Sequence, residues 1–131
     1  MITNARFAVV YVGDQQQALE FFRETLGCEV LTDAPYGDGS RWIEVRPPDA
    51  QTSLVLSAPG QETREALRER LGEMANVWFD CDDLDATFSE LRAKGVTFSV
   101  EPQAAPWDPD SRWAQFADPD GNLYGLSERA D

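Results

Sequence analysis

Two stretches of the chain repeat one order of hydrophobic and polar positions. In each, an apolar run ends at an aspartate, Asp14 or Asp83, and residues at helical spacing follow until a glycine, Gly27 or Gly95. An aspartate accepts hydrogen bonds from the free N–H groups of a helix start, and glycine favours a helix end. The pattern therefore predicts two helices with these four residues at their ends. Their apolar stripes are Ala18, Leu19, Phe22 and Leu26, and Leu84, Thr87, Phe88 and Leu91.

Short apolar or alternating runs surround both helices and predict strands, one before each helix and three after it. The predicted strands are 5–13, 28–34, 40–47, 52–58, 75–81, 96–101, 111–117 and 122–127.

The two stretches also share sequence. Phe7–Asp14 aligns with Asn76–Asp83 at an offset of 69 residues, and Ser-Arg-Trp at 40–42 recurs at 111–113 with an offset of 71. Pro48-Asp49 recurs at the same later offset as Pro119-Asp120. Three short matches in one order, with a drift of two residues, indicate a duplicated unit.

The predicted fold class is therefore α+β, with two βαβββ modules in one compact domain. The first module spans 1–60, a linking helix rich in acid–base pairs spans 61–73, and the second module spans 74–131. Each four-stranded sheet has one helix, which leaves its other face uncovered. We expect the two curved, mixed sheets to pair side by side and enclose a cleft, a preferred place for small ligands.

The charge balance narrows the choice of ligand. The chain has eleven Lys and Arg residues and 24 Asp and Glu residues, a net charge of −13, which disfavours binding to nucleic acid or anionic membranes. This acidity could serve solubility alone, or it could indicate a preference for cationic ligands. No apolar run approaches the roughly 18 residues of a membrane span, and no signal peptide is recognisable. Cys28 and Cys81 are interpreted as buried thiols of a cytoplasmic protein. Histidine, the commonest metal ligand, is absent.

Successive side chains of a strand point to opposite faces of its sheet, which places several aromatic and acidic side chains on the face that no helix covers. Ile43, Val45, Ala114 and Phe116 are expected to face the core, so their neighbours point the other way. Trp107, in a Pro-rich connection at 102–109, is expected at a rim or lid. Aromatic rings beside carboxylates suit a flat or cationic organic ligand. The candidate ligand-binding residues are Phe7, Tyr11, Trp42, Glu44, Trp78, Asp80, Trp107 and Trp113.

Structural interpretations of the same residues stay open at this stage. The tryptophans could fill the interior or pack in a dimer interface. Glu44 and Asp80 could be solvated or paired with Arg41, Arg46 or Arg112.

The chain resembles the vicinal oxygen chelate superfamily, which includes glyoxalase I, extradiol dioxygenases and bleomycin-resistance proteins. The resemblance covers nearly the whole chain. It rests on Val12–Asp14, Ala18–Phe22, Leu26-Gly27, Asp83–Phe88, Lys94–Val96 and Phe116–Leu123. The segment Asp118-Pro-Asp-Gly-Asn122 is interpreted as a turn. The resemblance implies the paired βαβββ fold and a homodimer.

Enzymes of that superfamily hold a divalent metal with His and Glu side chains. Carried onto this sequence, the resemblance places those positions at Phe7, Asn76 and Gly125 and in the strand Ser53–Ser57, which contains no His, Glu, Asp or Gln. Phe and Gly offer no side-chain donor and Asn is a poor one. We therefore expect no metal and no cofactor, and no metal-dependent glyoxalase or dioxygenase activity.

Two functional hypotheses remain, and they leave open whether the protein is an enzyme. The first is a small-molecule-binding protein that sequesters a drug, as the bleomycin-resistance branch of the superfamily does. The second is a metal-independent lyase, isomerase or dioxygenase-related enzyme, with Glu44 or Asp80 as its general acid or base. An inactive paralogue with a regulatory or structural role is a third possibility.

Overall fold

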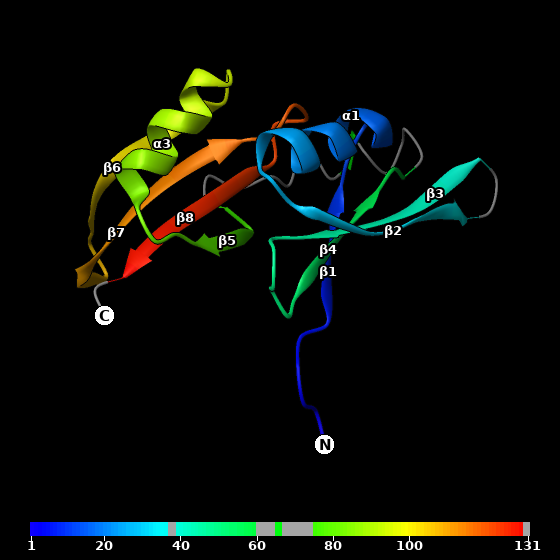
Figure 1. Cartoon of the computed structure of the whole chain (residues 1–131), viewed down its shortest axis with the longest axis horizontal. Coiled ribbons are helices and arrows are strands. Elements are labelled where there is room, and N and C mark those ends of the chain that lie inside the picture. The colour runs from blue at the N-terminus through cyan, green and yellow to red at the C-terminus, as the bar shows by residue number, and fades with distance from the viewer. Residues whose placement is uncertain (37–38, 60–64, 67–74, 130–131) are drawn as a thin grey trace. The chain divides into compact units, whose positions relative to one another are not determined.

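The computed structural model describes residues 1–36, 39–59, 65–66 and 75–129. The chain divides into two compact units, Met1–Arg70 and Leu71–Asp131. Each unit contains one open, four-stranded mixed sheet, and each sheet is accompanied by a helix (Figure 1). The α+β class and the two βαβββ modules predicted from the sequence are confirmed.

The first unit follows the predicted order of elements. Its strands have the spatial order β1-β4-β3-β2, in which β1 and β4 are parallel and the other pairs antiparallel. The elements are β1 (Phe7–Tyr11), α1 (Gln15–Glu20), a π-helical turn η1 (Phe21–Thr25), β2 (Glu29–Tyr36), β3 (Ser40–Arg46) and β4 (Ser53–Ser57).

The second unit repeats this topology. Its strands have the order β5-β8-β7-β6, with β5 and β8 parallel. The elements are β5 (Val77–Asp80), α3 (Leu84–Ala93), β6 (Thr97–Ala105), β7 (Asp108–Ala117) and β8 (Leu123–Arg129).

Both helices begin at the predicted aspartates. Asp14 Oδ1 accepts a hydrogen bond of 3.0 Å from the backbone N–H of Gln17, and Asp83 Oδ1 accepts one of 3.0 Å from Ala86. The chain leaves each helix through a glycine at positive φ, 77° at Gly27 and 90° at Gly95. Local side-chain chemistry thus sets the ends of both helices.

One face of each sheet forms the core with its helix. Helix α1 packs on β3 and β4, and α3 packs on β6, β7 and β8. Ile43, Val45, Ala114 and Phe116 are completely buried (0%), as the alternation predicts. Phe22, at the end of the first helix, is equally buried. These residues fix which face of each strand is left for other roles.

The β6–β7 hairpin is longer than the sequence predicts. Strands were expected at 96–101 and 111–117 with an irregular Pro-rich connection, but the ladder continues to a two-residue turn at Pro106 and Trp107. Proline cannot donate to a ladder, yet it is tolerated on edge strands and at bulges. Strand β6 is an edge strand, and Pro102 and Pro109 lie where the pairing register shifts.

The linking helix expected at 61–73 lies, apart from Glu65 and Ala66, outside the described residues. Within the described part, no helix is both long and apolar enough to cross a membrane.

Both cysteines are free thiols. Cys28 is buried, and burial raises the pKa of its thiol to about 11. Cys81 is only half-buried, and its sulfur lies 3.0 Å from the Thr87 hydroxyl.

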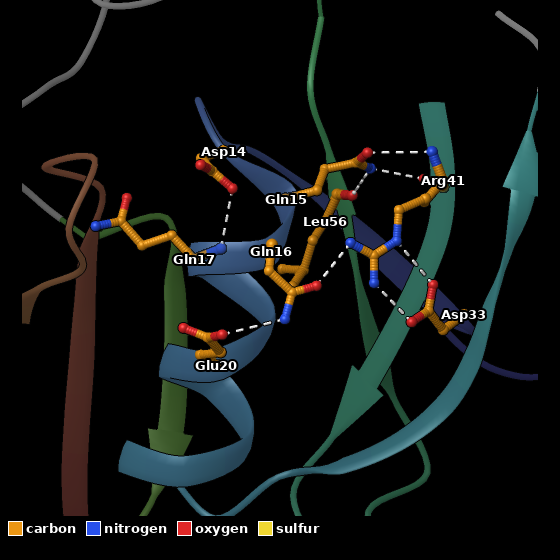
Figure 2. A network of polar contacts seen from close by, with 8 residues as sticks. All are labelled: Asp14, Gln15, Gln16, Gln17, Glu20, Asp33, Arg41 and Leu56. Carbon is orange, nitrogen blue, oxygen red and sulfur yellow. Dashed lines mark hydrogen bonds and ion pairs between the residues drawn. The ribbon is translucent and has the colours of Figure 1, made fainter. Parts of the chain in front are cut away.

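Gln15 joins α1 to the sheet of the first unit (Figure 2). Its Nε2 donates to the backbone oxygens of Arg41, at 2.6 Å, and Leu56, at 2.9 Å. Its Oε1 accepts from the backbone N–H of Arg41 at 3.1 Å. The last described β3–β4 pair is Ile43 with Leu56, so the side-chain amide continues the ladder where β4 no longer pairs with β3.

The arginine before each repeated tryptophan ties its strand to neighbouring elements. Arg41 forms a two-bond ion pair with Asp33, at 3.0 and 2.7 Å, and its guanidinium also reaches Gln16 at 2.9 Å. Arg112 forms the matching pair with Asp85 of α3, at 2.8 and 3.1 Å. These hydrogen bonds hold the pKa of both carboxyls below the usual range. Both arginines therefore have a structural role, and neither forms an ion pair with Glu44 or Asp80.

The Gln15 anchor can be tested by substitution. Gln15→Ala removes three hydrogen bonds and leaves part-buried backbone groups without them, so we expect the free energy of unfolding to fall by about 1–3 kcal/mol. Gln17→Ala is the matched control, because that exposed side chain lies on the same helix. Urea titration followed by circular dichroism measures both. Equal stability of the two variants would contradict the role given to Gln15.

Candidate functional site

The face of the first sheet opposite α1 carries a buried carboxylate. Glu44 alternates with the core residues Ile43 and Val45 and is itself only 8% exposed. The Ser53 hydroxyl donates to its Oε2 at 2.6 Å, and Trp42 Nε1 lies 3.4 Å from its Oε1. Among the described residues, no lysine or arginine forms an ion pair with it.

A buried carboxylate without a cation is costly to maintain. Two hydrogen-bond donors offset part of the desolvation of its charge, and a cationic partner would offset more. The arginines considered from the sequence are engaged elsewhere: Arg41 with Asp33, Arg46 with Glu29 and Arg112 with Asp85. Glu44 is therefore an acid that the described part of the fold leaves available to a positively charged group.

Aromatic rings lie beside this carboxylate. The ring of Phe7 meets that of Trp42 edge to face, with centroids 5.7 Å apart. Phe7 lies opposite Ser53 in the β1–β4 ladder, so both belong to the same face as Glu44. Tyr11, on the same side of β1 as Phe7, is 44% exposed. The structure thus brings together Phe7, Trp42 and Glu44 of the predicted residues, and adds Ser53, which the sequence did not single out.

Three tryptophans meet in the second unit. Trp78 of β5, Trp113 of β7 and Trp107 of the hairpin turn form a tryptophan cluster with every pair in contact. Ring centroids are 5.7 Å apart for Trp78–Trp107 and Trp78–Trp113, and 5.3 Å apart for Trp107–Trp113. Trp107 is 56% exposed. The extended hairpin brings Trp107 onto the other two rings, so it lies at the margin of this cluster.

Asp80 and Gln115 occupy the same face of the second sheet with different surroundings. The Asp80 side chain is 78% exposed, which matches the solvated interpretation, and its ion-pair partner at 3.4 Å is Arg129, which was not among the arginines considered from the sequence. Gln115 stands at the repeat position of Glu44 and is 4% exposed. Its amide accepts from the backbone N–H of Ala75 at 3.1 Å and donates to the Ser99 hydroxyl at 3.0 Å. The repeated position is thus acidic in one unit and neutral in the other.

The residues at the metal positions implied by the resemblance do not fit a metal. Gly125 pairs with Trp78 in the β5–β8 ladder. A Cβ added there would lie 2.7 Å from Trp78 Cζ3 and closer still to two other ring atoms. Phe7 is packed against Trp42, and Asn76 is exposed. Within the described residues, no three His, Cys, Asp or Glu side chains gather as a metal-binding group.

The Asp118–Asn122 segment is the turn predicted from the sequence. Asp118 is 7% exposed and its Oδ1 accepts from the backbone N–H groups of Asp120, at 2.9 Å, and Asn122, at 3.0 Å. Its Oδ2 accepts from the Asn122 amide at 2.9 Å and the Tyr124 hydroxyl at 2.7 Å. These four bonds occupy the carboxylate in holding the turn, which makes its role structural.

The sequence and fold match a known family over most of the chain. Residues 5–126 match the model of the Glyoxalase/Bleomycin resistance protein/Dioxygenase superfamily. The chain belongs to this superfamily. A member from Sphaerobacter thermophilus DSM 20745 is 32% identical, with a TM-score of 0.80 and 98% of each chain covered.

Two further proteins are similar over nearly their full length. TnmS3, an antibiotic-binding protein from Streptomyces sp. CB03234, is 35% identical with a TM-score of 0.81 and 98% of each chain covered. The uncharacterized protein YetH of Bacillus subtilis (strain 168) is 34% identical over 98% of this chain and 100% of its own. The glyoxalase and bleomycin-resistance fold predicted from the sequence is therefore confirmed.

The contact between Gly125 and Trp78 predicts that no side chain fits at position 125 of strand β8. In Gly125→Ala the new methyl group collides with the indole, so we expect a loss of about 1–3 kcal/mol in the free energy of unfolding. The near-ultraviolet circular dichroism of tryptophan should change as Trp78 moves. Ser127→Ala, on the same strand, is the control and should change neither signal. A Gly125→Ala protein of wild-type stability and spectrum would refute the contact.

Tyr124 predicts an alkaline limit to stability. Burial, reinforced by the charge of Asp118 and the hydrogen bond to it, raises the pKa of the Tyr124 phenol above its usual value of 10.0. The unfolded state therefore loses this proton first, and stability present below about pH 10 should fall as the pH rises further. Chemical unfolding across that range measures the fall. Tyr124→Phe should reduce it, whereas Tyr11→Phe should not; equal profiles for the two variants would contradict this assignment.

Proposed function

We propose that this protein binds a small, positively charged organic ligand with an aromatic part, and that it does so without a metal. The observation that carries the proposal is the buried Glu44 carboxylate, which lies beside Trp42 and Phe7 and has no cationic partner among the described residues. A ligand cation would supply the missing charge, and the ring faces would attract it further by about 0.5–2 kcal/mol each.

Further support comes from charge, family and the metal positions. The net charge of −13 draws cations toward the protein. A similar structure, TnmS3, is an antibiotic-binding protein, and sequestration of a drug is the corresponding role proposed here. The crowding of Gly125 by Trp78 argues against a side-chain metal ligand at that position.

The surroundings of the two carboxylates favour Glu44 over Asp80 in this role. Asp80 is exposed and already close to Arg129, so water and an existing partner satisfy its charge. Glu44 is held by the Ser53 hydroxyl and the Trp42 N–H, which fix its position without neutralising it. A fixed, dry anion attracts a cation more strongly than a solvated one does.

We also propose that the protein works in the cytoplasm as a homodimer. Its two thiols are free, and Cys28 is buried, which suits a reducing compartment. The dimer is expected from the family resemblance, and the exposed Val9 on β1 and Val30 on β2, at 45% and 36%, provide apolar surface on the edge strands of the first sheet.

A matched pair of probes tests the charge. N-methylquinolinium is a permanent cation, and quinoline at mildly alkaline pH is its neutral counterpart of similar shape. We expect the cation to bind more tightly in isothermal titration calorimetry, with an affinity that falls as salt is added. Glu44→Gln should weaken the cation about tenfold or more, equivalent to about 1.4 kcal/mol, and change quinoline little.

Asp80→Asn is the matched control for the loss of one carboxylate and should leave the affinity for the cation within about twofold, because exposed charges contribute little. Circular dichroism checks that both variants fold. Absence of binding of the cation to the wild-type protein, or equal affinity for the cation and for quinoline, would reject a cation site at Glu44.

A further inference from the structure

One indole N–H in the tryptophan cluster lacks a hydrogen-bond acceptor. Trp113 Nε1 is buried and has no partner among the described residues. The other two indoles held in the strands do have acceptors: Trp78 Nε1 donates to the Ala75 backbone oxygen at 3.2 Å, and Trp42 Nε1 reaches Glu44 at 3.4 Å. Burying a donor without an acceptor costs about 1–3 kcal/mol, so Trp113 is the exception that needs a reason.

The exposed neighbour of Trp113 is the residue best placed to move. Trp107 lies in the two-residue turn between β6 and β7, is 56% exposed, and has its ring centroid 5.3 Å from that of Trp113. Its ring stands at 57° to that of Trp113 and at 90° to that of Trp78. When Trp107 turns outward, its contacts with the other two rings are broken and a ring surface on both is uncovered, and a flat aromatic ligand on that surface would replace those contacts.

We propose that Trp113 Nε1 donates a hydrogen bond to a carbonyl oxygen on a flat aromatic ligand, and that Trp107 is the lid that this ligand turns aside. The inference goes beyond the proposed function, because it gives the second unit a binding surface of its own, for an aryl ketone or amide. The rings of Trp78 and Trp113, tilted by 33° to each other, supply the apolar surface for its aromatic part.

The acceptor is a neutral carbonyl rather than a carboxylate. Asp80 pairs with Ser127 in the β5–β8 ladder, and Ser127 pairs with Trp113 in the next ladder, so the Asp80 carboxylate and the Trp113 side chain share one face. A carboxylate ligand would be repelled by the net charge of −13, to which Asp80 contributes on this face. A ketone or amide oxygen accepts the same hydrogen bond without that repulsion.

Fluorenone and fluorene test the carbonyl, because they share one flat ring system and differ in a single oxygen. We expect the wild-type protein to bind fluorenone more tightly in calorimetry. Trp113→Phe keeps an aromatic ring but removes the N–H and some ring surface. The lost surface should weaken both probes alike, whereas the lost hydrogen bond should lower the preference for fluorenone over fluorene about fivefold, because fluorene has no oxygen to accept it.

Proton NMR of the indole N–H groups provides a readout that does not depend on a variant folding. In the free wild-type protein, the Trp113 resonance should lie upfield of the Trp78 resonance, whose N–H is hydrogen-bonded. Fluorenone should move the Trp113 resonance downfield, and fluorene should not. Trp107→Ala should speed the association of both probes while the preference for fluorenone is kept.

Each opposite result overturns a defined part of the inference. Equal binding of the two probes, or a Trp113 resonance that fluorenone leaves in place, rejects the hydrogen bond, whether or not N-methylquinolinium binds. An unchanged association rate in Trp107→Ala rejects the lid. Loss of N-methylquinolinium binding would count against the proposed function instead, because that probe tests Glu44 in the other sheet.

Discussion

A single helix covers only one face of a four-stranded sheet, and this geometric constraint governs both halves of the protein. The side chains along each strand alternate between the two faces of its sheet, so those facing α1 or α3 form the core and the others lie in a different environment. In the first unit these include Glu44, Trp42 and Phe7, and in the second the tryptophan cluster. The residues that we propose for ligand binding lie where the fold has no helix to cover them.

The duplicated units use this constraint in different ways. The repeat position on the third strand is the charged Glu44 in one unit and Gln115 in the other. The Gln115 amide forms hydrogen bonds with Ala75 and Ser99 and carries no charge. The Glu44 carboxylate also accepts hydrogen bonds, but no cation among the described residues compensates its charge. Duplication therefore preserved the backbone and its helix ends while the chemistry of the two uncovered faces diverged.

Interactions between residues close in the sequence made the helices and most strands predictable. Contacts that depend on how distant strands pair could not be predicted. Asp14 and Asp83 cap helices because the groups they bind are three residues away. The hairpin was predicted too short because proline argues against a strand unless it lies on an edge strand or where the pairing register shifts, as Pro102 and Pro109 do. The contact of Trp107 with Trp113 and the bond from Ser53 to Glu44 depend on the register between strands, which no short sequence window contains. The cleft expected between the two sheets remains a prediction.

The fit of Trp78 over the bare backbone of Gly125 couples two positions that are far apart in the sequence. Neither can accept a larger or coordinating group alone, since a side chain at 125 strikes the indole, and a smaller residue at 78 leaves a hollow over the glycine. Introducing a metal-binding side chain at position 125 by single substitutions would therefore pass through a variant that is either overpacked or contains a cavity. The two positions can change to a larger pair only together.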